Sequence, residues 1–334
     1  MNTIYSALIA PMQRTRVDVF ESIFMVFLGL GTLVGIVVVA YTLYNAYKYR
    51  DTGEAGDDKD LPSLGELPTG GKGGKKLFLS FGISAVIVIS LVIWTYTMLL
   101  YVENADAAKS EQERALEEPV KVTGEGFAWL FEYDNGIETV STLRVPADQR
   151  VFLNVTSGDV WHTFGVPDQR VKVDAIPGEH ETGWFEAEEA GTEHTIRCFE
   201  LCGSSHTSMT GTVQVMEPDE FESWMDEQLT MEFEMVDSNE SPVTDGYEMT
   251  LVSQETDFER TYTADDFDEN GTIEINDVEH GGKYNVTITS TDGQFETVET
   301  QFDMTGPVSE TYTLEMNATE SDATASDTND GGDA

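Results

Sequence analysis

Two long apolar runs dominate the first third of the chain. Residues 22–47 and 77–102 each contain 26 consecutive residues without Asp, Glu, Lys or Arg. A helix of that length is roughly 39 Å long, which is enough to cross a bilayer. The first run is too long for the apolar part of a signal peptide, and Asp18 and Glu21 precede it. The pattern therefore predicts a transmembrane helical hairpin over 22–102, joined by a loop at 48–76.

The pattern changes to short alternating segments further along the chain. Residues 103–118 form a polar segment that leads away from the second span, and glycine, proline and aspartate then separate runs typical of β-strands. A helical spacing of apolar residues follows at 218–229. The strands are predicted at 127–133, 150–156, 183–188, 194–198 and 211–216. We therefore expect an all-β sandwich domain over 103–230.

A second set of strand-like segments occupies residues 231–316. Within it, "DENGTIEINDVEHGGKYNVTI" (268–288) resembles the small β-sandwiches of the carboxypeptidase-regulatory or prealbumin-like type. This resemblance predicts an additional C-terminal β-sandwich domain. Residues 317–334 are acidic and of low complexity, which is typical of disorder.

The charge is distributed very unevenly. The chain has 62 acidic and 18 basic residues, a net charge of −44, and residues 1–102 contain eight of each kind. All of the excess negative charge therefore lies after residue 102. Concentrated salt screens the self-repulsion of such a surface, so we expect a halophilic source, an archaeon. Membrane lipid is an expected partner, whereas nucleic acid is not.

Lysine and arginine predict the orientation. Six of them lie in the loop at 48–76, whereas the segment 1–21 holds only Arg14 and Arg16. The positive-inside rule places that loop in the cytoplasm of a two-pass protein of the cell membrane. Both termini and all residues after 102 are then expected outside.

The segment "CFELCGSSHTSM" (198–209) contains both cysteines of the chain, with a histidine and a methionine close behind. In an oxidising compartment Cys198 and Cys202 could form a disulfide, or they could be unrelated core residues. Thiolate, imidazole and thioether groups are also the donors that copper prefers. With His162 upstream, two bridging thiolates could hold two copper ions, one histidine on each.

The segment "HTFGVPDQRVKVDAIPGE" (162–179) followed by "CFELCGSSHTSM" resembles subunit II of the haem–copper cytochrome c oxidases, over roughly residues 15–230. The resemblance implies a cupredoxin domain with a binuclear copper A centre. Cys198 and Cys202 would bridge two copper ions. The other ligands implied are His162 and His206, Met209 as a weak ligand, and the backbone carbonyl of Glu200. The side chain of Glu200 would reach a magnesium ion shared with subunit I.

Aromatic residues alternate along "GFAWLFEYDNG" (126–136). The residues alone favour a sandwich core or a surface stripe. The resemblance implies that electrons enter through the tryptophan of this strand, which is Trp129.

The resemblance also implies an electron-transfer function. The chain would accept electrons from an external blue-copper protein or cytochrome c and pass them to haem in subunit I, which reduces oxygen. This chain alone would perform no oxygen chemistry. Its partners would be subunit I, which carries haem and copper B, and subunit III. Two alternatives stay open: the copper A subunit of a haem–copper nitric oxide reductase, and a membrane-anchored copper carrier.

Overall fold

The computed structural model describes residues 15–48, 50, 71–103, 116 and 118–317. Most of the predicted loop 48–76, most of the segments 1–21 and 103–118, and nearly all of the tail 317–334 lie outside the described residues. The helices are α2 (Arg16–Lys48), α3 (Gly71–Glu103) and α5 (Pro218–Gln228), with 3-10 turns η2 (Pro167–Gln169), η3 (His206–Ser208) and η4 (Ala264–Asp266). The strands are β1 (Val120–Glu125), β2 (Ala128–Glu132), β3 (Glu138–Val140), β4 (Thr142–Pro146), β5 (Gln149–Ser157), β6 (His162–Val166), β7 (Val171–Ala175), β8 (Glu181–Ala187), β9 (Glu193–Cys198), β10 (Thr210–Met216), β11 (Met231–Asp237), β12 (Tyr247–Ser253), β13 (Glu259–Thr263), β14 (Thr272–Ile275), β15 (Gly282–Ser290), β16 (Val298–Met304) and β17 (Val308–Leu314).

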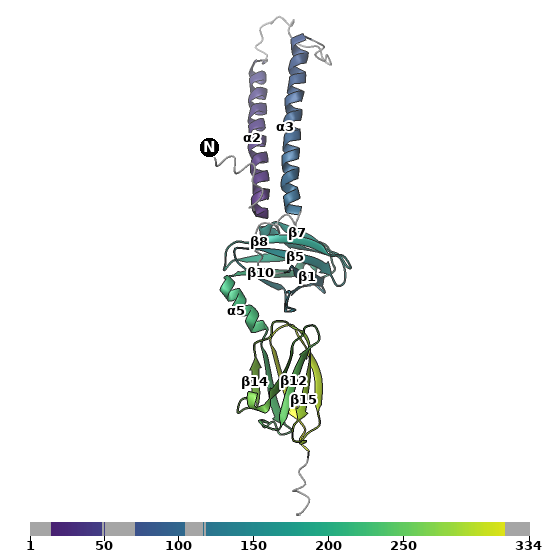
Figure 1. The fold of residues 1–334 in the computed structure, drawn as a ribbon. Coiled ribbons are helices and arrows are strands. Elements are labelled where there is room, and N and C mark those ends of the chain that lie inside the picture. The colour runs from purple at the N-terminus through teal and green to yellow at the C-terminus, as the bar shows by residue number, and fades with distance from the viewer. Residues whose placement is uncertain (1–14, 49, 51–70, 104–115, 117, 318–334) are drawn as a thin grey trace, which may run out of the picture.

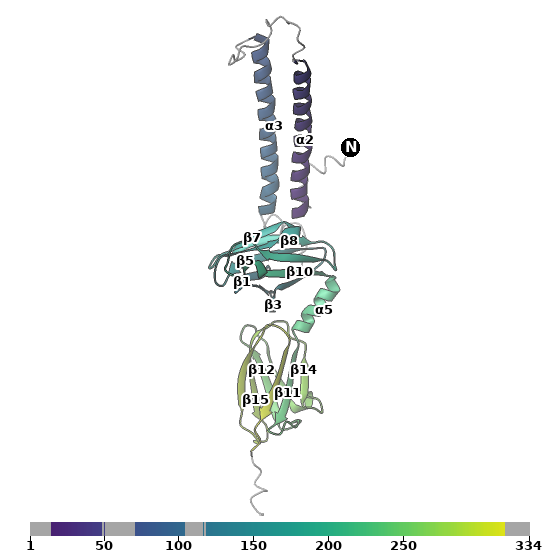
Figure 2. The ribbon, with the colours of Figure 1, turned by 180° about the vertical axis from the view of Figure 1, so that it is seen from behind.

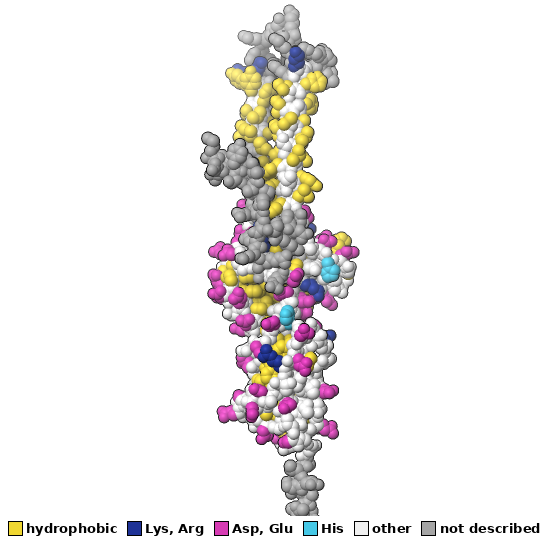
Figure 3. Space-filling view, in the orientation of Figure 1, with side chains coloured by type: hydrophobic (Ala, Val, Ile, Leu, Met, Phe, Trp, Pro, Cys, Tyr) yellow, Lys and Arg dark blue, Asp and Glu magenta, His cyan; other side chains and the backbone are white. Residues whose placement is uncertain are grey.

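The two long helices lie side by side and stand end-on over the first β-domain (Figure 1). By length and composition, both are apolar enough to cross a membrane. Apolar side chains cover them along their length, as Figure 3 shows, and most of these side chains are exposed. Buried residues of the pair gather at the end nearest the β-domain, where Val19, Met98 and Val102 pack together. Such exposure is expected of helices whose surroundings are lipid rather than protein.

The first β-domain is a sandwich of two five-stranded sheets. Their strand orders are β3-β2-β1-β5-β8 and β4-β10-β9-β6-β7. Most neighbours are antiparallel, but β1–β5 and β4–β10 are parallel. Residues alternate along β2, so that Trp129 and Phe131 point into the core and meet Phe164 from the opposite sheet. The prediction of an all-β domain of the cupredoxin type behind a helical hairpin is confirmed.

A second sandwich follows α5. It combines the three-stranded sheet β14-β11-β17 with the four-stranded sheet β13-β12-β15-β16. Two backbone hydrogen bonds tie it to the first sandwich, from Glu138 N–H to the Thr305 carbonyl and from Gly281 N–H to the Asn135 carbonyl. The second sandwich therefore lies at the side of the first that is remote from the helices, as both views show (Figures 1 and 2).

Candidate metal centre

Strand pairing brings the upstream histidine to the cysteine segment. His162 is the first residue of β6 and Cys198 is the last residue of β9. These strands pair with Phe164 opposite Cys198, and the Phe199 N–H donates to the Thr163 carbonyl at 2.9 Å. The sheet therefore positions two side chains that are separated by 36 residues in the sequence. His206 begins η3, and Met209 stands between η3 and β10.

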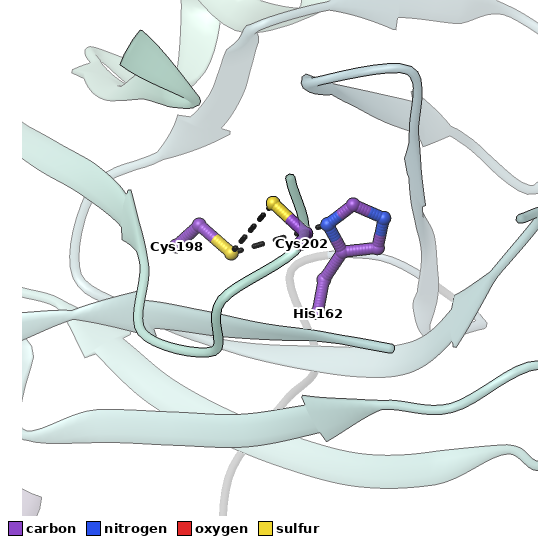
Figure 4. Close-up of side chains that lie close together, drawn as sticks. All are labelled: His162, Cys198 and Cys202. Atoms are coloured by element: carbon purple, nitrogen blue, oxygen red, sulfur yellow. Dashed lines mark hydrogen bonds between the residues drawn. The ribbon is translucent and has the colours of Figure 1, made fainter. Parts of the chain in front are cut away.

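The two sulfur atoms lie close together without being bonded. The Sγ atoms of Cys198 and Cys202 are 3.9 Å apart, and both cysteines are free. A disulfide bond is only about 2.05 Å long, so this geometry favours two separate sulfur ligands. Each sulfur has its own imidazole: Cys198 Sγ is 3.9 Å from His162 Nδ1, and Cys202 Sγ is 3.6 Å from His206 Nδ1. Figure 4 shows His162 and the two cysteines converging on one point.

Two further donors complete the group. The Met209 Sδ lies 3.8 Å from the Cys202 Sγ, and the backbone carbonyl of Glu200 lies 3.3 Å from the Cys198 Sγ. Glu200 itself is exposed. The structure thus brings together the side chains or carbonyl of all six positions that the sequence singled out as ligands.

A carboxylate fixes the ring of the buried ligand. His162 is 0% exposed, and its Nε2 lies 2.7 Å from the Oδ1 of Asp159. The ring therefore presents Nδ1 to the sulfur atoms, which is the usual role of a carboxylate behind a ligating histidine. Gly124 leaves room for this arrangement, because a Cβ there would lie 3.0 Å from both the His162 ring and the Trp129 ring.

The pKa values of two groups at the site, Asp159 and Cys202, are shifted in opposite directions. Partial burial opposes the ionisation of Asp159, but hydrogen bonds from the Gly126 N–H, the His162 ring and the Val160 N–H together lower its pKa to about 2. Burial and the neighbouring Cys198 sulfur raise the pKa of Cys202 to about 11. A cation between the sulfur atoms would reverse the second effect, because a metal ion favours the thiolate.

The donor set fits copper. Two thiols, two imidazoles and a thioether are soft or borderline ligands, with one carbonyl oxygen beside them, whereas magnesium and calcium prefer oxygen alone. Among the described residues, His162, Cys198 and Cys202 form the group whose ligand atoms lie within 4.8 Å of one another. This supports a copper site at the position predicted from the sequence.

Trp129 lies in the core of the first sandwich, one of the two positions that its alternating pattern favours. It is 0% exposed and packs edge-on against the rings of His162 and Phe164, with centroids 6.0 and 5.1 Å away. A docked donor protein would not contact this ring directly, and electron entry through Trp129 stays a prediction. Burial in the core, the simpler reading of the alternating pattern, explains its position.

A second tryptophan at the site is exposed. Trp161, directly before the ligand His162, is 48% exposed, and its neighbour Val160 is 47% exposed. Trp161 belongs to no alternating run, so the periodic pattern does not single it out. The available signal was an apolar pair, Val160 and Trp161, immediately before a candidate ligand.

The chain is similar to respiratory oxidase subunits. The family described as "Cytochrome C oxidase subunit II, periplasmic domain" matches residues 129–216. The "Heme-copper oxidase subunit 2" of Aeropyrum pernix is 37% identical over 209 residues, which are 60% of this chain and 85% of that protein. The chain belongs to the subunit II family of haem–copper oxidases.

The chain is also similar to two further proteins. The "Cytochrome c oxidase subunit 2" of Alkalihalophilus pseudofirmus is 31% identical over 58% of this chain and 54% of that protein. The crystal structure of the periplasmic domain of subunit II of cytochrome oxidase from Bradyrhizobium japonicum shares 31% identity, with a TM-score of 0.32, over 33% of this chain and 92% of that one.

Family membership favours one of the three functions that the sequence left open. The chain is a subunit of a haem–copper oxidase complex, and its first sandwich is the copper domain that accepts electrons. The relatives are oxidase subunits, which favours this function over a nitric oxide reductase subunit or a copper carrier.

Proposed function

We propose that the site holds two copper ions and is the binuclear copper A centre of the oxidase. The observation that carries the proposal is the pair of sulfur atoms, 3.9 Å apart, each with its own imidazole nitrogen within 4 Å. Cys198 and Cys202 would bridge both ions, and His162 and His206 would each bind one. Met209 and the carbonyl of Glu200 would be the weaker ligands.

When bound, two copper ions that share one electron through bridging thiolates spread the change in charge over many atoms. The residues of this chain keep the ligands in place. Asp159 holds the His162 ring with Nδ1 inward, and Met209, which is 1% exposed, is packed against the sandwich core. Ligands that are held by a packed β-scaffold move little when the charge changes, which favours rapid electron transfer.

Electrons would arrive from an external donor, either a blue-copper protein or a cytochrome c. The exposed ring of Trp161 next to the ligand His162 supports a contact there. Trp129 stays a candidate only as a buried relay, because its ring packs against His162. From the copper centre, electrons would pass to haem in subunit I, which also carries copper B. Subunit III would complete the complex.

Magnesium is a second proposed cofactor. The Glu200 backbone faces the Cys198 sulfur, while the exposed side chain leaves a carboxylate available on the outer side of the same loop. Hard oxygen ligands suit magnesium. Because one carboxylate does not make a complete site, the remaining ligands would come from subunit I.

The topology is proposed from the charge pattern. The loop 48–76, with its six basic residues, would face the cytoplasm, and the copper domain would lie outside the cell membrane. Protease added to intact cells is expected to cut after residue 102 and to spare the loop. Cleavage within 48–76 from outside would contradict this orientation.

Copper stoichiometry and electron paramagnetic resonance test the proposal on the full-length chain in lipid nanodiscs. We expect two copper ions per chain and a hyperfine pattern that is split by two equivalent copper nuclei. Cys202→Ser should abolish this pattern, since each thiolate would bridge both ions. Ser205→Ala, in the same loop, is the control and should keep it. A single copper ion per chain with an ordinary one-copper spectrum would reject the binuclear centre.

A further inference from the structure

Five residues join the helical pair to the copper domain, and we call them the junction cluster. They are Arg16 from α2, Tyr101 and Val102 from α3, Arg150 from β5 and Trp184 from β8. Trp184 is 1% exposed and Arg150 is 2% exposed. Val102 is also buried, whereas Arg16 and Tyr101 are half-buried at the edge of the cluster. The cluster lies where the helices stand over the β7 and β8 end of the sandwich (Figures 1 and 2).

Two guanidinium groups lie over one indole ring. The Cζ atom of Arg16 is 5.6 Å and that of Arg150 is 5.3 Å from the centroid of the Trp184 ring. Tyr101 meets the same ring edge-on, at 5.8 Å and 85°. A cation above a tryptophan ring is most stabilising where water is excluded. Trp184 thus links a residue of each helix to a strand of the sandwich.

Hydrogen bonds fix the end of α3 in the same place. The carbonyl of Val102 accepts bonds from the Trp184 Nε1–H at 3.1 Å and from the Arg16 Nη1–H at 3.0 Å. Carbonyl groups in the last turn of a helix have no partner within the helix. The Arg150 Nη2–H donates to the Tyr101 hydroxyl at 3.2 Å. The carbonyl of Val102 in the last turn of α3 is therefore satisfied by the copper domain and by α2 together.

Arg16 also contacts the turn at Arg170, which follows the strand with the candidate ligand His162. Its Nε–H donates to the carbonyl of Arg170 at 3.3 Å. Arg170 has a left-handed backbone, with φ of 54°, and joins η2 to β7. The strand before η2 is β6, which begins with His162. One side chain at the start of α2 thus contacts the end of α3 and the turn that follows the ligand strand.

We propose that the junction cluster is a positioning device for electron transfer, in which Trp184 and the two arginines hold the copper domain at one height and angle over the helices. The inference rests on the proposed function, because the position matters only if electrons leave the copper centre toward a membrane-bound partner. Arg16, Arg150 and Trp184 act through the position of the domain and touch no ligand atom. In this proposal, contacts within this chain set the distance from the copper centre to the electron acceptor, and contacts with the partner subunits add to them.

Arg16→Gln tests the device, because Arg16 lies on α2 and its loss removes no residue from the copper domain. Hydrogen exchange of the full chain in nanodiscs should show amides of the last turn of α3 exchanging roughly tenfold faster, since a buried cation–π contact and a charge-assisted hydrogen bond are lost. In the assembled oxidase, electron transfer from the copper centre to the first haem should slow several-fold. Copper content and the copper spectrum should be unchanged.

Arg50→Gln is the matched control, since Arg50 lies over the ring of Tyr47 at the other end of α2, 4.1 Å from its centroid.

A second variant separates a shared device from independent contacts. Trp184→Phe keeps an aromatic ring but loses the bond to the Val102 carbonyl. If the residues act as one unit, the double variant with Arg16→Gln should be no slower than the slower single variant. Wild-type exchange and wild-type electron transfer in Arg16→Gln would overturn the proposal, as would strictly multiplicative effects of the two substitutions. Failure of the wild-type chain to form a binuclear spectrum would instead reject the proposed function, and the exchange measurement would still report on the junction.

Discussion

The carboxylate of Asp159 accepts a hydrogen bond from the Nε2–H of His162 at 2.7 Å, and this leaves Nδ1 of the same ring facing the sulfur of Cys198 at 3.9 Å. One contact therefore determines which nitrogen is available for a metal ion. The loop gives Asp159 its own support, because its carboxylate also accepts bonds from the N–H groups of Gly126 and Val160.

Asp159→Ala should weaken copper binding. Without the carboxylate, the buried imidazole loses the group that holds its orientation, and comparable losses lower metal affinity by roughly 10- to 100-fold. Asp159→Asn keeps an acceptor oxygen and should fall between wild type and the alanine variant. Copper titration of the full chain measures this. Asp168→Ala is the control, since Asp168 lies 3.7 Å from His194, a histidine outside the site. Equal affinities for the wild type and Asp159→Ala would contradict the role of Asp159.

Gly124→Ala should disturb the site by adding a methyl group beside the His162 ring, rather than by removing a contact. The added methyl group would meet the His162 and Trp129 rings at 3.0 Å, closer than a carbon atom normally approaches. One of the two rings must shift, so we expect lower copper affinity and an altered spectrum. Gly306→Ala places a methyl group 3.8 Å from its nearest neighbour and should leave both unchanged. A wild-type spectrum in Gly124→Ala would show that the ring tolerates the displacement.

Trp161→Ala should slow the reduction of the copper centre by its donor several-fold. The ring is half-exposed beside His162, so its loss removes contact area without removing a ligand or a core residue. Stopped-flow kinetics with intact copper content is the measurement. Val140→Ala, an equally simple loss of an exposed apolar side chain on β3, should have no effect. An unchanged rate for Trp161→Ala would place the donor elsewhere.

Trp129→Leu should instead reduce stability. Its ring is fully buried between the sheets. Truncation of a buried tryptophan to alanine costs about 3–5 kcal/mol of the free energy of unfolding, and the smaller change to leucine should cost less. Trp129→Phe keeps an aromatic ring beside His162 and loses no hydrogen bond, because the indole N–H has no partner among the described residues. If Trp129 is also a relay, the phenylalanine variant should fold normally but accept electrons more slowly. A normal rate in that variant would leave Trp129 with a structural role alone.

Glu138 should make the fold less stable at neutral pH. Partial burial is the largest cause that raises the pKa of Glu138, and repulsion from the nearby carboxylates of Glu132 and Asp303 raises it further. The folded-state pKa of Glu138 lies above its unfolded-state value. The contribution of Glu138 to the free energy of unfolding is therefore most favourable at low pH, and it is lost as the pH rises through the folded-state pKa. Glu138→Gln should therefore raise the midpoint of thermal unfolding at pH 7, by on the order of 1 °C.

The advantage of Glu138→Gln should shrink in molar salt, which screens the carboxylates, and should disappear well below the ordinary glutamate pKa of about 4.3. Glu259→Gln, on β13 of the second sandwich, controls for the loss of one negative charge. A gain that is the same at every pH would exclude the titration of Glu138 as its cause.

The sequence by itself determined the two long helices, five of the ten strands of the first sandwich and the identity of the candidate ligands. The two uncharged runs predict helices, and the alternation around Phe131 predicts a strand, because both patterns are local and repeat with the period of the backbone. The spacing from Cys198 to Met209 also lies within one loop. Copper donors could therefore be named without knowledge of the fold.

Only the tertiary structure decided how these residues meet. The sequence allowed a disulfide between Cys198 and Cys202, and the 3.9 Å separation of their sulfur atoms favours two free ligands. Trp129 could have been exposed or buried, and the opposite sheet buries it. The contact of Arg16 with Trp184 joins residues from different domains, and no periodic pattern reports it. Such contacts depend on how the elements pack, because burial and ring orientation are set by neighbours that are distant in the chain.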